Sequence, residues 1–209
     1  MEKKECEILY LSPELAVVDK PFGLSSGEDG LIPLLRSTLR GRGQQEEIYP
    51  VHRLDRETGG LMVFARTPEA AADLSAQIRE GGFEKVYEAQ LSGVPEQPEG
   101  TLRDLLFHDR QRNKTYIADR KRKGVKEAEL YYETVKTTAQ GCIVRVRLKT
   151  GRTHQIRVQF ASRALPLVGD RKYGGPKADH LHLTAVRLSF NAKNGERLIF
   201  TRRAGFYED

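Results

Sequence analysis

The stretch His52-Arg-Leu-Asp-Arg-Glu-Thr-Gly-Gly-Leu-Met-Val-Phe-Ala65 joins a run of polar residues directly to a run of apolar ones. Its second half, Leu61–Ala65, is continuously apolar and predicts a strand that is covered on both faces. Its first half places charged side chains in the loop before that strand, a position where protein scaffolds often present reactive groups. The carboxylate of Asp55 lies between two arginines, which would favour its ionised form. Spacing alone leaves a structural salt-bridge turn as the alternative.

Patterns on either side of this stretch predict the rest of the fold. Thr67-Pro68 predicts the capped start of a helix that ends at Gly81-Gly82. Thr153 is expected to cap a second helix, with Ile156, Phe160 and Ala164 at helical spacing. Further strands are predicted over 15–19, 83–91, 128–133, 142–149, 180–190 and 197–206, the last two as a hairpin, and a short helix over 31–39. Together these elements predict an α+β fold, with a mixed, largely antiparallel sheet and flanking helices, in a single domain spanning 1–209.

The composition is that of an ordinary globular protein. Of the 209 residues, 38% are hydrophobic and 31% are charged, which excludes a disordered chain. No segment approaches the roughly 20 apolar residues of a membrane-spanning helix, and the first residues lack the pattern of a signal peptide. We therefore expect a cytoplasmic monomer that does not bind membranes. The two cysteines, Cys6 and Cys142, are expected to be small hydrophobic residues rather than a disulfide.

Positive charge is concentrated in one segment. The chain has a formal charge of +6 and a pI of about 9.3, which favours a polyanionic partner. Between Arg103 and Lys126 there are nine lysines and arginines against three aspartates, so this segment alone accounts for a charge of +6. We interpret it as a basic loop or arm that grips phosphates, with a merely solvated loop as the alternative.

The usual cofactor and metal motifs are absent from the sequence. There is no Gly-x-Gly-x-x-Gly, no phosphate-binding Gly-Lys-Ser/Thr loop and no Gly-x-Ser-x-Gly elbow. His180 and His182 have no Cys or His companions at zinc-like spacing. A second polar motif, Gly151-Arg-Thr-His-Gln-Ile-Arg157, lies between a predicted strand and a predicted helix. An enzyme built from this chain would therefore use side chains only, with no cofactor.

The chain resembles the RluA-type pseudouridine synthases, and the matching motifs follow one another in the order of that family. The residues that carry the resemblance are Val17-Val-Asp-Lys-Pro-Phe-Gly-Leu24, the aspartate motif 52–60, Lys85-Val-Tyr87, the motif 151–157, Gly169-Asp-Arg-Lys-Tyr-Gly174 and Leu181-His182. This order and coverage favour a catalytic Asp55 over a salt-bridge turn. The resemblance implies the pseudouridine synthase catalytic fold.

The resemblance also implies an activity and a set of catalytic residues. The enzyme would extrude a uridine of ribosomal or transfer RNA into a pocket and isomerise it to pseudouridine. Asp55 would be the nucleophile. Tyr87 would pack on the extruded base, and Arg157 would pair with Asp55, keeping that carboxylate ionised and oriented.

Other positions are implied as RNA-binding rather than catalytic. Arg53, Lys85 and His154 are expected to contact RNA or to support the site. Within the basic segment, the residues expected to bind RNA are Arg120, Lys121, Arg122 and Lys123. Many relatives carry a small RNA-binding domain ahead of the catalytic one. With about ten residues before the first predicted strand, we expect none here.

Three positions depart from the family pattern, and two other functions compete with the one above. Gly59 stands where Ser is usual, Gln159 where His is common and Leu183 where Ala is common. The alternatives are a non-catalytic RNA-binding protein with a synthase fold, and a metal-independent nuclease that uses His52 or His154. The first alternative predicts a lost aspartate, arginine or tyrosine, and all three are present. The second requires two titrating groups beside a phosphate, and no such pair is evident.

Overall fold

The computed structural model describes residues 6–139 and 141–206, and these residues form two compact units. Unit 1 contains residues up to Lys85 together with Thr184–Ala204. Unit 2 contains Val86–Leu183 and the last described residues. The sequence predicts a single domain because no stretch between the units has the composition of a linker. The chain passes from one unit to the other within predicted strands.

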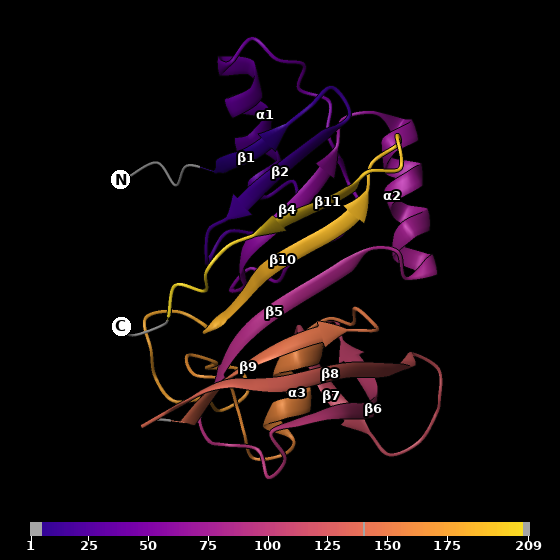
Figure 1. The fold of residues 1–209 in the computed structure, drawn as a ribbon. Helices are drawn as coiled ribbons and strands as arrows, with labels where there is room; N and C mark the ends of the chain where they lie inside the picture. Colours follow the sequence, from indigo (N-terminus) through magenta and orange to yellow (C-terminus); the bar gives the residue numbers. More distant parts are fainter. Residues whose placement is uncertain (1–5, 140, 207–209) are drawn as a thin grey trace. The chain divides into compact units, whose positions relative to one another are not determined.

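Unit 1 is built on a mixed sheet with the strand order β1-β2-β4-β10, in which β11 pairs with β10 and β3 pairs with β4 (Figure 1). β4 and β10 run parallel, and the other pairs are antiparallel. The strands are β1 (Glu7–Leu11), β2 (Leu15–Lys20), β3 (Tyr49–Pro50), β4 (Gly59–Ala65), β10 (Leu183–Asn191) and β11 (Arg197–Thr201). The predicted C-terminal hairpin is confirmed by the β10–β11 pairing.

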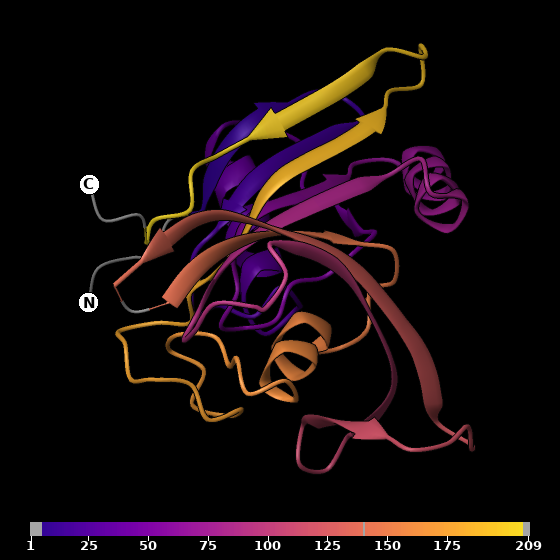
Figure 2. The ribbon, with the colours of Figure 1, turned by 60° about the horizontal axis from the view of Figure 1, so that its bottom comes forward.

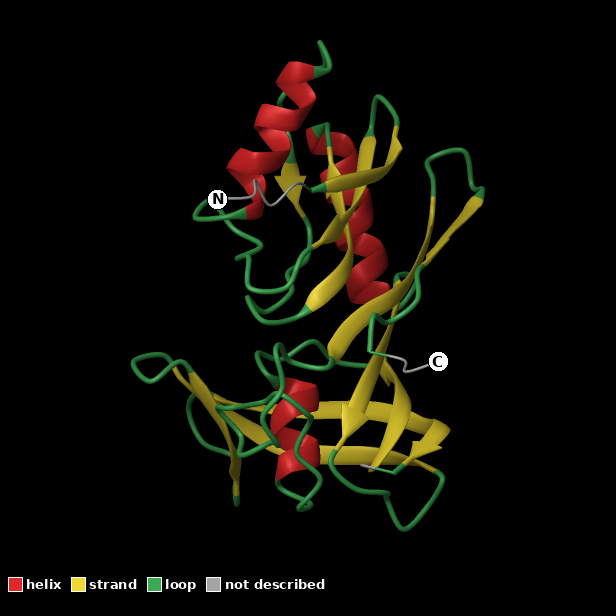
Figure 3. Cartoon of the chain, turned by 90° about the vertical axis from the view of Figure 1, so that its left-hand side faces the viewer, coloured by secondary structure: helices red, strands yellow, loops and turns green. Residues whose placement is uncertain are grey.

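Two helices flank the strands of unit 1 (Figure 3). α2 (Pro68–Glu80) begins and ends as predicted: the Thr67 hydroxyl accepts a hydrogen bond from the Ala70 amide, and Gly81 is left-handed with φ of 83°. Leu74 of α2 packs with apolar residues of β2 and β4 in one buried cluster. α1 (Leu31–Gly41) buries its own apolar face. Every residue of β4 is buried, as its continuous apolar run predicts.

Gly60 is required by the parallel pairing of β4 with β10. Its φ is +111°, and a Cβ at this position would lie 2.3 Å from the carbonyl oxygen of Ala185, its partner in β10. Any side chain here would therefore push the two strands apart. The glycine pair of the aspartate motif thus allows β4 to begin directly after the Asp55 loop.

Unit 2 is built on an antiparallel sheet with the order β5-β9-β8-β6-β7 (Figure 2). Val158 of the short helix α3 packs with Leu106 of β6 and Ala128 of β8. The elements of this unit are β5 (Glu84–Leu91), β6 (Glu99–Asp109), β7 (Lys114–Ala118), β8 (Val125–Thr138), β9 (Gly141–Leu148) and α3 (Gln155–Ala161).

The predictions for the two ends of α3 are wrong. His154, not Thr153, is the N-cap residue, and it has left-handed backbone angles with φ of 54°. Ala164 lies beyond the helix, with φ of 59°. The carbonyl of Thr153 instead accepts a hydrogen bond from the Thr115 hydroxyl. A contact with a distant strand therefore decides where this helix begins.

The predicted basic loop or arm at about 103–126 is also wrong in its structure. Most of the segment is strand, in β6, β7 and the start of β8, and the longer of its two connections covers only 119–124. The sequence does not predict these strands because charged residues occupy many of their outward-facing positions. The positive charge itself is present as predicted.

Candidate functional site

The main chain of the Asp55 turn in unit 1 is held by hydrogen bonds on both sides of Asp55. The Thr58 amide donates to the carbonyl oxygen of Asp55 at 3.1 Å, closing a tight turn before β4. The buried hydroxyl of Ser26 donates to the carbonyl oxygen of Leu54 at 2.9 Å. The Gly23 amide donates to the carbonyl oxygen of Arg56 at 2.8 Å. The main chain around Asp55 is therefore fixed by residues 23–26.

Lys20, at the end of β2, ties the same two segments together with a buried charge. Its side chain is 0% exposed. The ammonium donates to the carbonyl oxygens of Pro21 at 3.0 Å, Leu24 at 2.7 Å and Arg56 at 3.2 Å. Three carbonyl dipoles compensate a cation that would be very costly to bury alone. The lysine of the Lys-Pro-x-Gly motif thus supports the aspartate loop.

His52 attaches the other end of the aspartate motif to β4. Its Nε2 accepts a hydrogen bond from the Val63 amide at 3.1 Å, so the proton of the neutral ring lies on Nδ1. Nδ1 is buried and has no hydrogen-bond partner within the described part of the chain. Burial, with a smaller contribution from the charge of Lys85, lowers the pKa of His52 to about 3. This ring is therefore neutral at physiological pH, which argues against a nuclease that uses His52 as an acid.

The two arginines that flank Asp55 differ in their surroundings. Arg56 forms an ion pair with Asp29 at 2.8 Å, and Asp29 also accepts a hydrogen bond from Ser25 at 2.6 Å. Arg53 is exposed and has no hydrogen bond or ion pair with any described residue. Arg56 therefore supports the loop, whereas Arg53 presents its charge to solvent, as an RNA contact requires.

Lys85 and Tyr87 lie at the start of β5, as the alternating pattern predicts. Tyr87 is 6% exposed and pairs with Val146 of β9. Lys85 is half-buried, and burial lowers the pKa of its ammonium. Lys85 is assigned to unit 1 and Tyr87 to unit 2.

In unit 2, the motif 151–157 is organised by Gln155 and Arg157. The Gln155 side chain accepts hydrogen bonds from the Thr150 hydroxyl and the Arg152 amide, and donates to the Glu129 carbonyl. Arg157 forms a bidentate salt bridge with Asp170, with Nε–Oδ2 and Nη2–Oδ1 distances of 2.7 and 2.8 Å. Their side chains are 3% and 0% exposed. Asp170 is a partner of Arg157 that the sequence analysis did not identify, although it lies in a quoted motif.

His154 is buried in a hydrogen-bond network rather than exposed to a ligand. Its Nδ1 lies 3.0 Å from the hydroxyl of Tyr173, which also accepts from the Thr115 amide and donates to the Thr115 carbonyl. Because the hydroxyl proton is already donated, Nδ1 of His154 is the donor to Tyr173. Burial raises the pKa of Tyr173 to about 12, so its hydroxyl stays protonated at physiological pH. Of the two roles expected for His154, the structure favours support over RNA contact.

The four basic residues expected to bind RNA lie in the connection between β7 and β8, and all are exposed. Lys121 forms an ion pair with Glu127, and the Arg122 guanidinium lies 5.8 Å from the centre of the Phe107 ring. Arg120 and Lys123 have no ion pair among the described residues. Lys121 and Arg122 therefore contact other residues of the protein, whereas Arg120 and Lys123 are available to phosphates.

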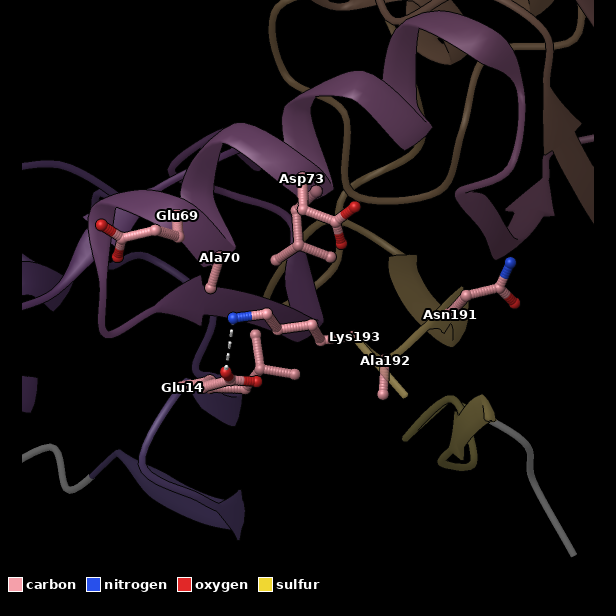
Figure 4. Close-up of a pocket in the computed structure, with 9 residues that line it drawn as sticks. Glu14, Glu69, Ala70, Asp73, Asn191, Ala192 and Lys193 are labelled. Atoms are coloured by element: carbon pink, nitrogen blue, oxygen red, sulfur yellow. Dashed lines mark ion pairs between the residues drawn. The ribbon is translucent and has the colours of Figure 1, made fainter. Parts of the chain in front are cut away.

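Each unit has a pocket lined by described residues. The pocket of unit 1 has a volume of about 180 Å³ and lies between α2, β2 and the β10–β11 turn. Figure 4 shows its polar lining, which includes three acids, Glu14, Glu69 and Asp73, and the Lys193 ammonium near Glu14. This negative lining disfavours RNA. The pocket of unit 2 has a volume of about 580 Å³ and lies between β6, the start of β8 and the motif 151–153.

Within each unit, some of the predicted site residues are brought together. Asp55 and Arg53 share one loop of unit 1, supported by Lys20 and His52. His154, the N-cap of α3, and Arg157, in its first turn, both contact the segment of unit 2 that holds Asp170 and Tyr173. No group of three or more His, Cys, Asp or Glu suited to a metal occurs within 6–139 and 141–206. Over the same residues, no helix has the length and apolarity needed to cross a membrane.

Comparison with known families shows to which protein family the aspartate motif 52–60 and the motif 151–157 belong. The model of the RNA pseudouridylate synthase family matches residues 14–162, which include Asp55, Tyr87 and Arg157. The human RNA pseudouridylate synthase domain containing 4 has a similar fold, with a TM-score of 0.80 and 23% identity. That alignment covers 95% of this chain and 88% of the human one.

Three bacterial relatives illustrate the similarity in sequence. Ribosomal large subunit pseudouridine synthase D of Pseudomonas aeruginosa is 36% identical over 177 residues, 82% of this chain and 54% of the relative. An uncharacterised RNA pseudouridine synthase of Zymomonas mobilis is 37% identical, covering 83% of this chain and 81% of the relative. tRNA pseudouridine synthase C of Vibrio parahaemolyticus is 31% identical, with 87% and 78% covered. The chain thus spans about half of the first relative and about four-fifths of the other two.

Proposed function

Because the chain belongs to the RNA pseudouridylate synthase family, we propose that it isomerises a uridine of ribosomal or transfer RNA to pseudouridine, with Asp55 as the nucleophile. The observation that carries the proposal is the way the Asp55 turn is built. A fully buried ammonium, two backbone hydrogen bonds and one hydrogen bond from the Ser26 hydroxyl fix the main chain around Asp55. A catalytic group must be positioned by its surroundings in this way.

The proposed reaction conserves all atoms and electrons. The bond between C1′ of the ribose and N1 of uracil breaks with assistance from Asp55, the base rotates, and a bond forms between C1′ and C5. The C5 proton leaves and N1 gains a proton, so no oxidant, reductant or energy source is needed. This balance suits a site made only of side chains.

Tyr87 and Arg157 complete the proposed site. In this proposal, Tyr87 packs on the extruded uracil and accepts the C5 proton at the end of the reaction. Arg157, whose side chain is held in one orientation by its pair with Asp170, would pair with Asp55 and keep that carboxylate ionised. In this proposal the enzyme acts as a monomer in the cytoplasm.

The proposal is tested by mapping pseudouridines in total RNA from cells with and without this gene. At least one site should disappear without the gene and return with the wild-type protein, but not with Asp55→Asn. Glu47→Gln is a matched control, since it removes an exposed carboxylate of the same unit. If no site disappears, or if Asp55→Asn restores it, the proposed reaction is wrong. A folded Asp55→Asn protein that still binds RNA shows that the loss is chemical.

RNA binding by the connection between β7 and β8 is tested separately. Replacing Arg120 and Lys123 with Ala leaves the Lys121–Glu127 pair and the Arg122–Phe107 contact in place. The slope of log affinity against log salt should then fall by about 2, because two phosphate contacts are lost. Arg79→Ala/Lys177→Ala removes the same charges elsewhere and should leave the slope unchanged. Equal slopes for both double variants would refute RNA contact by this connection.

A further inference from the structure

The pocket of unit 2 has a lining that the proposed reaction does not use. It is about 580 Å³ in volume, within the usual range of small-molecule sites. Its lining combines an apolar side chain, an imidazole and three cations. The residues that matter here are Leu106, His108, Arg110, Lys126 and Arg152.

The lining of the pocket has more positively charged side chains than negatively charged ones. Asp109 is the only acid in the lining, and its carboxylate accepts the amides of Gln111 and Arg112 at the β6–β7 turn. Arg110 and Lys126 are exposed and have no ion pair with any described residue. Such cations, around a concave surface, are suited to a phosphate group.

Leu106 adds apolar surface next to His108. In the regular pairing of β6 with β7 and β8, Leu106, His108 and Lys126 share one face, whereas Phe107 points to the other face, where the Arg122 guanidinium lies 5.8 Å from the centre of its ring. A base or ribose in the pocket would therefore pack against Leu106 and His108.

The hydrogen bonds of His108 set its tautomer. The Thr115 hydroxyl donates its proton to the Thr153 carbonyl at 2.8 Å. The same hydroxyl oxygen lies 3.1 Å from Nδ1 of His108, so Nδ1 must be the donor in that contact. In this tautomer Nε2 is left as an acceptor. An exocyclic amino group of a base, or a ribose hydroxyl, could donate to it.

We propose that this pocket binds a single nucleotide of the RNA substrate, distinct from the target uridine, with its phosphate against Arg110 and Lys126 and its base or ribose against Leu106 and His108. RNA as the source of that nucleotide rests on the proposed function, whereas the affinity of the pocket for a nucleotide does not. Because RNA-binding proteins read unpaired bases that are splayed out of the helix, this pocket would select RNA by a nucleotide outside the reaction centre.

The first test uses mononucleotides and the imidazole signals of the full chain. The sequence has five histidines, and His108→Gln identifies the signal of His108 in the NMR spectrum. Titration with the 5′-monophosphates of uridine, cytidine, adenosine and guanosine should shift this signal to saturation for at least one of them. Inorganic phosphate should bind at least tenfold more weakly than that nucleotide. No saturable shift, or equal binding of phosphate alone, overturns the proposal.

Variants then distinguish binding in the pocket from a general effect of positive charge on the protein. Arg110→Ala/Lys126→Ala should weaken binding of the preferred nucleotide by at least tenfold. Arg79→Ala/Lys177→Ala, with the same change in charge, should leave binding unchanged. Thermal unfolding of each variant confirms that it is folded. Equal weakening by both double variants overturns the proposal.

The same variants link the pocket to the reaction. On a substrate RNA, Arg110→Ala/Lys126→Ala should raise KM with little change in kcat, because the uridine still meets an intact reaction centre. A change confined to kcat overturns the assignment to RNA. If the wild-type protein forms no pseudouridine in any RNA, the proposed function fails, while the mononucleotide titration still decides whether the pocket binds nucleotides.

Discussion

The buried ammonium of Lys20 donates a hydrogen bond to the carbonyl oxygen of Arg56, 3.2 Å away, and so joins the end of β2 to the residue that follows Asp55. The two residues are 36 positions apart in the chain. Since the same ammonium also binds the carbonyls of Pro21 and Leu24, one cation fixes the turn after β2 and the turn before β4 together. A distortion of one turn would therefore be transmitted to the other.

We predict that Lys20→Met lowers both stability and kcat. The methionine fills a similar volume but leaves three carbonyl groups without their donor, at a cost of about 3 kcal/mol in the free energy of unfolding. The Asp55 turn loses the hydrogen bond that connects it to Lys20, so kcat should fall more than KM rises. Urea unfolding and steady-state kinetics measure the two effects. Lys193→Met, which removes an exposed lysine of the same unit, should change neither. An unaltered unfolding free energy in Lys20→Met would contradict the role given to this ammonium.

The neutral ring of His52 predicts a specific loss of stability in acid. Burial lowers the pKa of His52 to about 3 in the folded protein, against an ordinary value of 6.5. Below pH 6.5 the unfolded chain takes up a proton at this position that the folded protein does not. The contribution of His52 is therefore fully present above pH 6.5 and declines by about 1.4 kcal/mol per pH unit as the pH falls toward 3.

This contribution is isolated by comparison with His52→Gln, whose amide oxygen can still accept the Val63 amide. The difference in unfolding free energy between wild type and variant should shrink steadily between pH 6.5 and 4.5 in urea titrations. A difference that stays constant over this range would mean that the ring titrates normally in the folded protein.

Most of the local structure could be predicted from the sequence because it follows from local patterns. The caps of α2, the buried β4 and the C-terminal hairpin all follow from neighbouring residues. The start of α3 could not be predicted in this way, because it depends on a hydrogen bond from Thr115, 38 positions before Thr153. The strands within 103–118 could not be predicted because charged side chains occupy many of their outward-facing positions.

The candidate site also contains some residues that could be predicted from the sequence and others that could not. Resemblance between motifs identified Asp55, Tyr87 and Arg157 as site residues, although their roles remain predictions. It also covered the segments of Lys20, Asp170 and Tyr173 without indicating what they do. Their contacts join segments distant in sequence, and a motif does not state which of its residues meet.

Gly59 and Phe22 are predicted to depend on each other. A Cβ on Gly59 would lie 2.9 Å from two carbon atoms of the Phe22 ring, so Gly59→Ser should cost about 1–3 kcal/mol of stability through overpacking. Phe22→Ala removes the ring, and the double variant should therefore be more stable than the sum of the single effects by more than 1 kcal/mol. Urea unfolding of the four proteins measures this coupling. Gly41→Ser, where a Cβ meets no atom within 4 Å, is the control. Additive effects would show that the ring moves aside freely.

The Arg157–Asp170 pair should behave as a buried pair, and the Arg163–Asp104 pair as its surface counterpart. Asp170 is 0% exposed in its side chain, so Arg157→Met leaves a buried carboxylate without its partner and should cost about 3–5 kcal/mol. Arg163→Met breaks a similar contact between side chains that are 36% and 13% exposed, where water replaces the lost partner and the cost should stay below about 1 kcal/mol.

Adding Asp170→Leu to Arg157→Met removes the stranded charge, and the double variant should regain most of the lost stability. It should nevertheless form no pseudouridine, because the guanidinium proposed to pair with Asp55 is gone. Unfolding in urea and single-turnover assays measure the two properties separately. If the restored double variant were as active as wild type, Arg157 would be a structural residue only, and Asp55 would have to be kept ionised by another group.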